Sequence, residues 1–313
     1  MIGGERKRGF IYAVVAAATY GMIPLFALPL YGIGGMNPDS VLLLRYFFAI
    51  LIVAFMLKVR GRSLRMKHGE FLPLLAMGVI MSLSSLSLFG SYRYMDGGIA
   101  STILFVYPVI VAVIMAVFYK EKITLPVALC IMLALGGIAL LYIGDSGKTL
   151  SLRGTLLVLF SAFFYAIYIV CVNNSRLKRI PTLKLTLYMM LFGLPLFVVR
   201  ILWGGTFTMP SHWYLWGNIV ALALFPTAIS FICTTKAVQY IGATPTAILG
   251  AIEPLAAIFI GVLVFDEKLT LRICIGLIMI ILSVTMVVAG ANINDTLIHF
   301  KKLFPKLKRR KQR

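Results

Sequence analysis

One segment of this chain occurs twice, and the repeat limits the folds that are open to it. In the first copy, Pro108 opens an apolar stretch that ends with Glu-Lys-Ile-Thr-Leu, starting at Glu121. In the second copy, Pro254 opens a stretch that ends with Glu-Lys-Leu-Thr-Leu, starting at Glu267. Both pairs are 146 residues apart (254 − 108 and 267 − 121). A constant offset between unlike residue types indicates a duplicated unit.

The repeat extends to polar residues outside this segment. Ser84 matches Ser230 and Tyr94 matches Tyr240 at the same offset, while Tyr20 matches Tyr165 at an offset of 145. One residue of difference in loop length explains the change of offset. We therefore predict a first repeat over residues 1–146, a second over 147–292 and a basic tail over 293–313.

The composition places both repeats in a membrane. The chain is 61% hydrophobic and 13% charged, with a mean hydropathy of +0.98, whereas soluble domains carry about 25% charged residues. A helix needs about 20 apolar residues to cross the hydrocarbon. Ten segments qualify: 9–31, 39–57, 71–92, 97–119, 125–143, 153–173, 182–202, 214–236, 243–265 and 271–290. We expect an all-α integral membrane protein of ten transmembrane helices, arranged as two inverted five-helix repeats.

The basic residues predict the orientation of the chain. With the N-terminus in the cytoplasm, 23 of the 30 Lys and Arg residues lie in cytoplasmic segments, 6 lie outside and Arg45 lies within a span. The positive-inside rule then places both termini of a multi-pass protein on the cytoplasmic side of the cell (plasma or inner) membrane. Five spans per repeat invert the second copy. The tail is expected to contact anionic lipid, and no motif for nucleic acid accompanies it.

These features carry a family resemblance. Ten spans in two copies, the sequence Arg-Tyr-Phe-Phe-Ala from Arg45, the Glu253–Pro254 pair and the doubled motif that follows Pro108 resemble EamA-type transporters of the drug/metabolite transporter superfamily. The similarity covers about residues 8–290. It implies a polytopic transporter, often an exporter of amino acids or other small metabolites, and it does not choose a substrate.

Glu253 is the deepest acidic residue of the predicted spans. A charge at the centre of a bilayer costs about 2.5–3.5 kcal/mol on insertion scales, so it requires a reason. Its carboxyl either bonds backbone groups freed by Pro254 or forms a substrate or proton site. Thr246, Gly250 and Glu253 share one helix face. Tyr107 occupies the matching position of the first repeat, so the two copies differ at this point.

Four other polar residues are candidate substrate contacts. Arg45 either extends to the membrane surface and anchors its helix, or pairs with a carboxylate of the protein or the substrate. Tyr20 and Tyr165 lie midway through their spans, too deep for an interfacial belt, and either pack or line a cavity. Ser84 either bonds a neighbouring helix or lines a polar path.

The doubled motif itself is expected to be structural. In inverted copies Glu121 and Glu267 lie on opposite faces of the membrane, where each would cap the N-terminus of the helix that follows. Pro108 and Pro254 interrupt their helices and provide kinks for gating.

Together these residues predict a secondary transporter that works by alternating access. A small-molecule substrate would bind between the repeats, with protons exchanged through Glu253. No nucleotide-binding motif is present, and we expect no cofactor, metal or catalytic group. A channel-like permease and an integral membrane enzyme are the alternatives. The candidate contacts are Glu253, Arg45, Tyr20, Tyr165, Ser84 and Tyr107, and the candidate gating residues are Pro108, Pro254, Glu121 and Glu267.

Overall fold

A computed structural model describes most of the chain, and every element that it describes is a helix. The predicted helical class is therefore confirmed for this part. The described residues are 2–61, 65–66, 68–94, 97–121, 124–142, 151–204, 206–265, 271, 274–276, 278–279, 281–283 and 286. Glu267, the basic tail and half of the predicted tenth span lie outside them.

Six helical stretches are long and apolar enough to cross a membrane, and they match the first, second, third, sixth, seventh and eighth predicted spans. They are Gly4–Gly32, Pro38–Val59, Phe71–Ser91, Leu152–Asn174, Thr182–Leu202 and Leu215–Ile241. The number of ten spans stays a prediction.

Several of the predicted spans consist of two helices. The first span contains α1 (Ile2–Tyr20) and α2 (Ile23–Gly32), the fourth α5 (Gly97–Leu104) and α6 (Tyr107–Tyr119), the eighth α10 (Leu215–Ala223), a π-helix (Leu224–Ile229) and α11 (Ser230–Ile241), and the ninth α12 (Ala243–Leu249) and α13 (Ile252–Phe265). The others are α3 (Pro38–Val59), α4 (Phe71–Ser91), α7 (Leu125–Tyr142), α8 (Leu152–Asn174) and α9 (Thr182–Leu202), with short 3₁₀ turns at His68–Glu70 and Arg176–Arg179.

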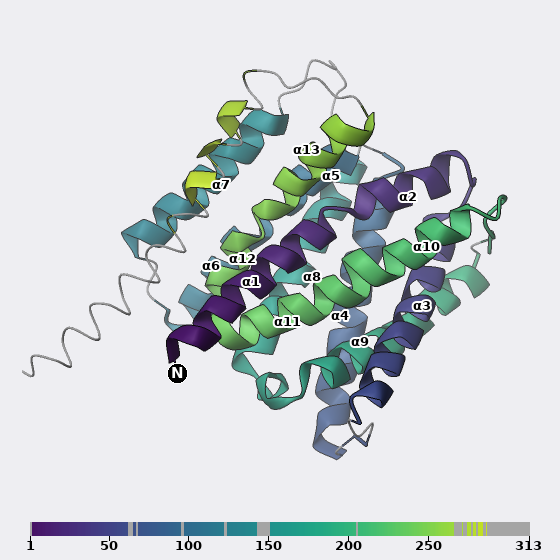
Figure 1. The fold of residues 1–313 in the computed structure, drawn as a ribbon, viewed down its shortest axis with the longest axis horizontal. Coiled ribbons are helices and arrows are strands. Elements are labelled where there is room, and N and C mark those ends of the chain that lie inside the picture. Colours follow the sequence, from purple (N-terminus) through teal and green to yellow (C-terminus); the bar gives the residue numbers. More distant parts are fainter. Residues whose placement is uncertain are drawn as a thin grey trace, which may run out of the picture.

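The helices pack in pairs that the duplication relates to each other. Helix α1 packs along α11, and its counterpart α8 packs along α4 (Figure 1). Helix α9 packs against α4, and its counterpart α3 packs against α10 and the π-helix. Helices α3 and α9, which are counterparts, also pack against each other. Two copies related by an approximate two-fold axis produce this pattern.

Matched serines hold the matched helix pairs together. Ser84 on α4 donates to the carbonyl of Ser161 on α8 at 3.0 Å, and Ser161 donates back to the carbonyl of Ser84 at 2.8 Å. Ser230 on α11, the counterpart of Ser84, donates to the carbonyl of Ala16 on α1 at 3.0 Å. Small side chains let helix backbones approach closely, and their hydroxyls bond across the contact.

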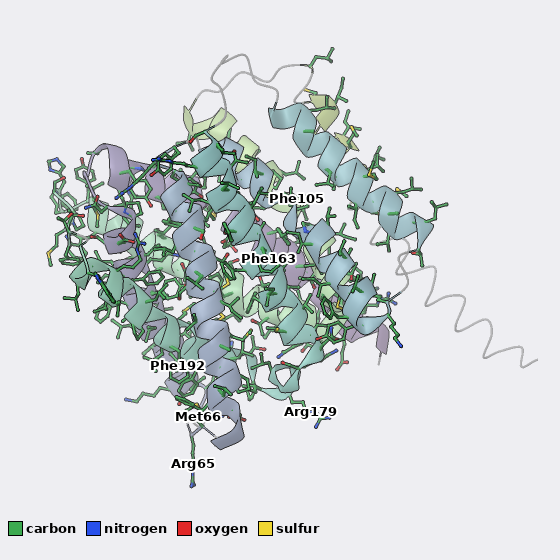
Figure 2. The ribbon with its side chains drawn as sticks, turned by 180° about the vertical axis from the view of Figure 1, so that it is seen from behind. Arg65, Met66, Phe105, Phe163, Arg179 and Phe192 are labelled. Carbon is green, nitrogen blue, oxygen red and sulfur yellow. The ribbon has the colours of Figure 1, made fainter. Side chains whose placement is uncertain are left out.

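The two ends of the bundle differ in charge. At one end α3 and α8 finish and α4 and α9 begin, and Arg60, Arg65, Lys178 and Arg179 gather there; we call it the basic end. Figure 2 shows Arg65 and Arg179 projecting at this end. At the opposite end α3 begins and α4 and α9 finish.

A substitution at Gly78 tests the close contact between α4 and α9. A Cβ at this position would lie 2.8 Å from the carbonyl oxygen of Met189 and 2.8 Å from the Cβ of Phe192. We expect Gly78→Ala to lower the free energy of unfolding by about 1–3 kcal/mol, the usual cost of overpacking. Thermal unfolding in detergent measures the change.

Gly217 on α10 is the matched control. Nothing lies within 4 Å of a Cβ placed there, so Gly217→Ala is expected to keep or raise the melting temperature because alanine favours helix. Equal melting temperatures for the two variants would contradict the close contact at Gly78.

Candidate functional site

A small, narrow cavity lies between the two repeats. Its volume is about 10 Å³, which is room for about one water molecule. The first repeat contributes α1 and α6, and the second contributes α8, α11, α12 and α13. The lining residues are Ala13, Ala16, Ala17, Tyr20, Tyr107, Tyr165, Ile169, Thr234, Thr246, Gly250 and Glu253.

Three helix breaks meet at this cavity. Helix α1 ends at Tyr20, helix α6 begins at Tyr107, and helix α12 ends one residue before Gly250. All three residues line the cavity. Irregular backbone at membrane depth is tolerated only where protein buries it or where it lines a cavity, so the breaks mark this place as a site.

Glycines let the broken segments approach each other. A Cβ at Gly21, in the break between α1 and α2, would collide with the carbonyl oxygen of Glu253. A Cβ at Gly250, in the break between α12 and α13, would collide with the hydroxyl of Tyr107. The cavity is narrow because backbone meets backbone or a phenol here without an intervening side chain.

Three tyrosines form the aromatic wall of the cavity. The rings of Tyr20 and Tyr165 are stacked, with centroids 6.0 Å apart and an interplanar angle of 15°. The ring of Tyr107 meets the edge of Tyr165 at 4.8 Å and 82°. Tyr20 and Tyr165, predicted as counterparts in the two repeats, therefore meet at the boundary between them.

Glu253 is the acidic group of the cavity and is only 6% exposed. Among the described residues, its carboxyl forms no hydrogen bond or ion pair. It lies near enough to Tyr20, Tyr107 and Tyr165 to act on each of them electrostatically. An uncompensated carboxyl at this depth is unusual for a purely structural group.

Arg45 lies in the core but not in the cavity lining. Its side chain is completely buried, so the interpretation that it extends to the membrane surface is wrong. Nε donates to the hydroxyl of Thr227 and Nη2 to the carbonyl oxygen of Pro226 at 3.3 Å, both in the π-helix. The guanidinium lies 5.0 Å from the ring centroid of Phe89. Its Nη1 is buried and has no partner among the described residues.

Ser84 is not part of the cavity. Its hydroxyl bonds Ser161 across the α4–α8 contact, so of its two predicted roles the structure shows the helix contact. The sequence does not distinguish a serine that faces a neighbouring helix from a serine that faces a cavity.

Glu121 does not cap α7, because α7 begins at Leu125 and Thr124 occupies the preceding position. The Glu121 carboxylate instead accepts a hydrogen bond from Thr244 in α12 at 3.4 Å. Pro108 and Pro254 lie in the first turns of α6 and α13, immediately after the two breaks. The two prolines therefore lie directly after helix breaks. The prediction that Glu121 caps the following helix is wrong.

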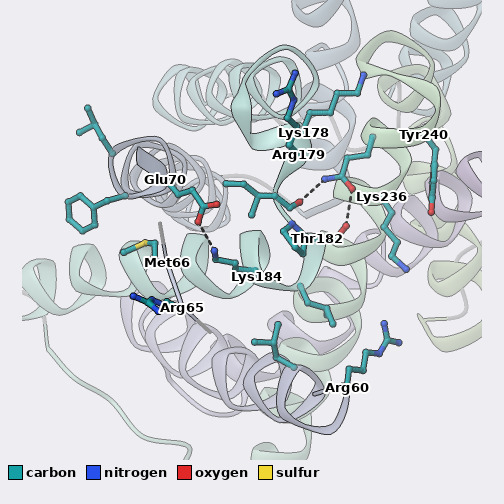
Figure 3. Close-up of a pocket in the computed structure, with 17 residues that line it drawn as sticks. Arg60, Arg65, Met66, Glu70, Lys178, Arg179, Thr182, Lys184, Lys236 and Tyr240 are labelled. Atoms are coloured by element: carbon teal, nitrogen blue, oxygen red, sulfur yellow. Dashed lines mark hydrogen bonds and ion pairs between the residues drawn. The ribbon is translucent and has the colours of Figure 1, made fainter. Parts of the chain in front are cut away.

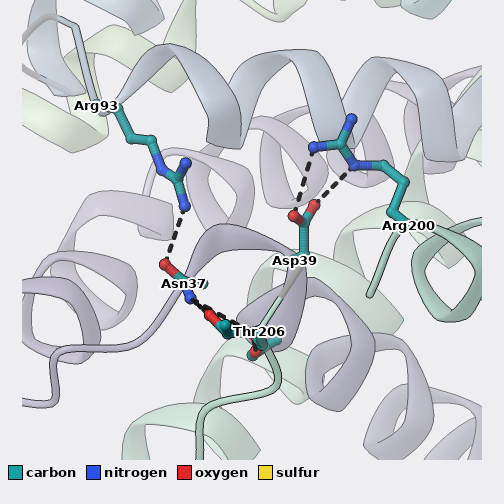
Figure 4. Close-up of polar contacts among 6 residues, drawn as sticks. Asn37, Asp39, Arg93, Arg200 and Thr206 are labelled. Carbon is teal, nitrogen blue, oxygen red and sulfur yellow. Dashed lines mark hydrogen bonds and ion pairs between the residues drawn. The ribbon is translucent and has the colours of Figure 1, made fainter. Parts of the chain in front are cut away.

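Each end of the bundle has its own pocket and its own ion pair. The pocket at the basic end has a volume of about 1690 Å³, and Lys184 pairs with Glu70 in it at 2.5 Å (Figure 3). The pocket at the opposite end has a volume of about 560 Å³, and Arg200 pairs with Asp39 in it at 3.1 Å (Figure 4). Sequence reasoning did not identify either pair.

A further polar contact closes the opposite end. Arg93 donates to the side-chain carbonyl of Asn37 at 3.0 Å, and the amide of Asn37 donates to the hydroxyl of Thr206 at 2.6 Å (Figure 4). These bonds tie α3 and α4 to the segment that follows α9.

Comparison with known proteins identifies the family. The model of the EamA-like transporter family matches residues 7–143 and again residues 152–289. The chain belongs to the EamA-like transporter family. It is therefore a multi-pass membrane transporter with a duplicated EamA unit.

Relatives of this EamA-like transporter match along most of its length. An uncharacterized transporter of Archaeoglobus fulgidus is 29% identical over 276 residues, covering 87% of this chain and 93% of the relative. The uncharacterized transporter YdfC of Bacillus subtilis is 26% identical, covering 78% and 80%. One solved crystal structure is similar in fold, with a TM-score of 0.76 at 17% identity, covering 91% of this chain and 97% of its own.

The contact between Gly250 and Tyr107 can be tested by a double-mutant cycle. We expect Gly250→Ala to lower the melting temperature because the new methyl group displaces the phenol. Adding Tyr107→Phe removes the hydroxyl, and we expect it to recover part of the loss, with a coupling of about 0.5–3 kcal/mol. Thermal unfolding of both single variants and the double variant provides the measurement, and strictly additive losses would contradict the contact.

Proposed function

We propose that this chain is a secondary transporter that exports amino acids or other small polar metabolites by alternating access. The observation that supports this best is the small cavity at which three helix breaks from both repeats meet. Glu253, Tyr20, Tyr165 and Tyr107 are the proposed substrate contacts. They offer a carboxyl group, phenol hydroxyls and aromatic faces, which suit a small polar solute.

The pockets at the two ends supply the entrances that alternating access requires. The ion pair Asp39–Arg200 ties α3 to α9 at the opposite end, and Lys184–Glu70 ties α9 to α4 at the basic end. Opening either entrance would separate the helices that its pair joins. We therefore propose that the two pairs act as gates that open in turn.

Arg45 has a supporting role in this proposal. Two of its nitrogens hold the π-helix between α10 and α11, and α11 carries Thr234 of the cavity lining. We propose that Arg45 fixes this segment, and that its unpaired Nη1 receives a substrate carboxylate only after the helices have moved.

The membrane and the orientation follow the charge distribution. We propose that the basic end faces the cytoplasm of a cell membrane, with both termini on that side, as the positive-inside rule requires. No described feature favours catalysis. A channel-like permease differs from a carrier in its kinetics, which counterflow measures.

Counterflow in proteoliposomes tests the proposed function. A thermal-shift screen of the purified protein first selects a metabolite that raises its stability, because a ligand of the folded state does so by mass action. We expect an excess of that metabolite inside the vesicles to accelerate uptake of its labelled form. An uptake rate that does not change with the internal metabolite would indicate a channel-like permease instead.

Proton coupling through Glu253 is a separate part of the proposal. The described titratable groups on which its carboxyl acts are Tyr20 from α1, Tyr107 from α6, Tyr165 from α8 and Tyr92 at the end of α4. None of these phenols carries a charge near neutral pH in its ordinary state. Glu253 is therefore the group of the cavity best suited to take up and release a proton during the cycle.

We expect Glu253→Gln to lose transport driven by a pH gradient while it retains counterflow, because an amide keeps the polarity but cannot release a proton. Glu121→Gln is the matched control, since its carboxylate lies outside the cavity against Thr244. Uptake with and without an imposed pH gradient separates the two variants. A Glu253→Gln protein with undiminished gradient-driven uptake would rule out this coupling.

A further inference from the structure

The pocket at the basic end has a lining that is strongly unbalanced in charge. Six cationic side chains and a single carboxylate line it, and that carboxylate already pairs with one of the six. The cations come from the end of α3, the segment after it, the Arg176–Arg179 turn, α9 and α11. They are Arg60, Arg65, Lys178, Arg179, Lys184 and Lys236 (Figure 3).

The orientation of the protein in the membrane does not by itself explain why these cations surround a pocket. Basic residues that only orient a membrane protein need to lie near the cytoplasmic surface, without converging on a hollow. Lys58 is such a residue: it is exposed at the end of α3 and does not line the pocket. The six lining cations, in contrast, surround a space of about 1690 Å³, which is wide enough for a solvated metabolite.

Lys236 holds a special position among the six. Its Nζ donates to the hydroxyl of Tyr12 at 3.2 Å and lies 4.6 Å from the centroid of that ring. Tyr12 is in turn stacked on Tyr240 at 6.1 Å. The contacts fix the ammonium in place, because a cation over an aromatic face is held electrostatically.

The fixed ammonium lies on a helix that also lines the central cavity. Tyr12 is the neighbour of Ala13 on α1, and Lys236 follows Thr234 by two residues on α11. Ala13 and Thr234 both line the cavity. Helix α11 therefore contributes side chains to both the pocket and the cavity.

We propose that the pocket at the basic end is a binding site for a small, water-soluble anion, with Lys236 as its receiving group, and that the transported substrate carries a net negative charge as carboxylate or phosphate. This rests on the proposed function and narrows it to one charge class. The concave, mainly cationic lining concentrates such a solute, since clefts of predominantly one charge raise local concentration and association rates by about 10- to 1000-fold.

The charge preference is measured with a single cysteine in the pocket. Thr182, which lines the pocket, is replaced in Thr182→Cys after the four native cysteines (Cys130, Cys171, Cys233 and Cys274) are changed to alanine. The protein is placed in nanodiscs of phosphatidylcholine. The probes are a sulfonate-bearing and a trimethylammonium-bearing methanethiosulfonate, and free 2-mercaptoethanol gives the reference ratio of their rates.

We expect the anionic reagent to be favoured about tenfold over the reference ratio. Lys236→Met is expected to reduce this preference at least threefold, and Lys58→Met, which removes the same charge outside the pocket, to leave it unchanged. A ratio equal to the reference, or an equal effect of the two substitutions, would overturn the proposal. So would a preference that disappears when phosphatidylglycerol is added, because a lipid headgroup would then be the occupant.

Binding provides the second readout. Phosphate, succinate and citrate are compared with succinamide at matched ionic strength by thermal shift. At least one anion is expected to raise the melting temperature of the parent protein and of Lys58→Met, but not that of Lys236→Met. A panel without a Lys236-dependent shift would overturn the proposal. Counterflow of a neutral or cationic solute would refute the proposed negative charge of the substrate but not the proposed transport function. Binding of an anion without counterflow of any solute would refute the transport function but not the anion site.

Discussion

The structure depends on the requirement that a backbone inside a bilayer satisfies its own hydrogen bonds. An unpaired backbone group costs several kcal/mol there, so spans are continuous helices except where protein shields a break. The breaks at residues 21–22, 105–106 and 250–251 meet this requirement locally. Tight bonds such as Val106 N–H to Ile103 and Ala251 N–H to Ile248, both 3.1 Å, satisfy the backbone. Because all three breaks adjoin one cavity, the irregular backbone and the polar side chains occupy the same place.

The two repeats share their packing but differ in their chemistry. Serine contacts hold α4 to α8 and α11 to α1 in the same way, so the scaffold is nearly symmetric. Charges break that symmetry: Asp39 and Lys184 occupy matching positions 145 residues apart, and these two side chains of opposite charge each form an ion pair. A path through such a molecule differs at its two ends, although the helices that line it correspond.

The sequence predicted those features of the site that follow from the internal repeat. The constant offset predicted that Tyr20 and Tyr165 are counterparts, and their stacking places both at the boundary between the repeats. It did not predict the surroundings of Arg45, because the π-helix that presents Thr227 and Pro226 has no distinct pattern in sequence. The pair Asp39–Arg200 joins residues 161 positions apart, and their partnership depends on how α3 packs against α9, which no local pattern specifies.

The size of the central cavity limits how the proposed cycle proceeds. A space of about 10 Å³ cannot hold a metabolite, so binding requires that the lining helices separate. The α1 wall consists of three alanines and Tyr20, and the backbone of Gly21, the next residue, lies against the carbonyl of Glu253. Movement of α1 away from α13 would therefore enlarge the cavity without breaking either Asp39–Arg200 or Lys184–Glu70, since these two pairs join other helices. The glycines at the breaks close the cavity and leave these segments free to part.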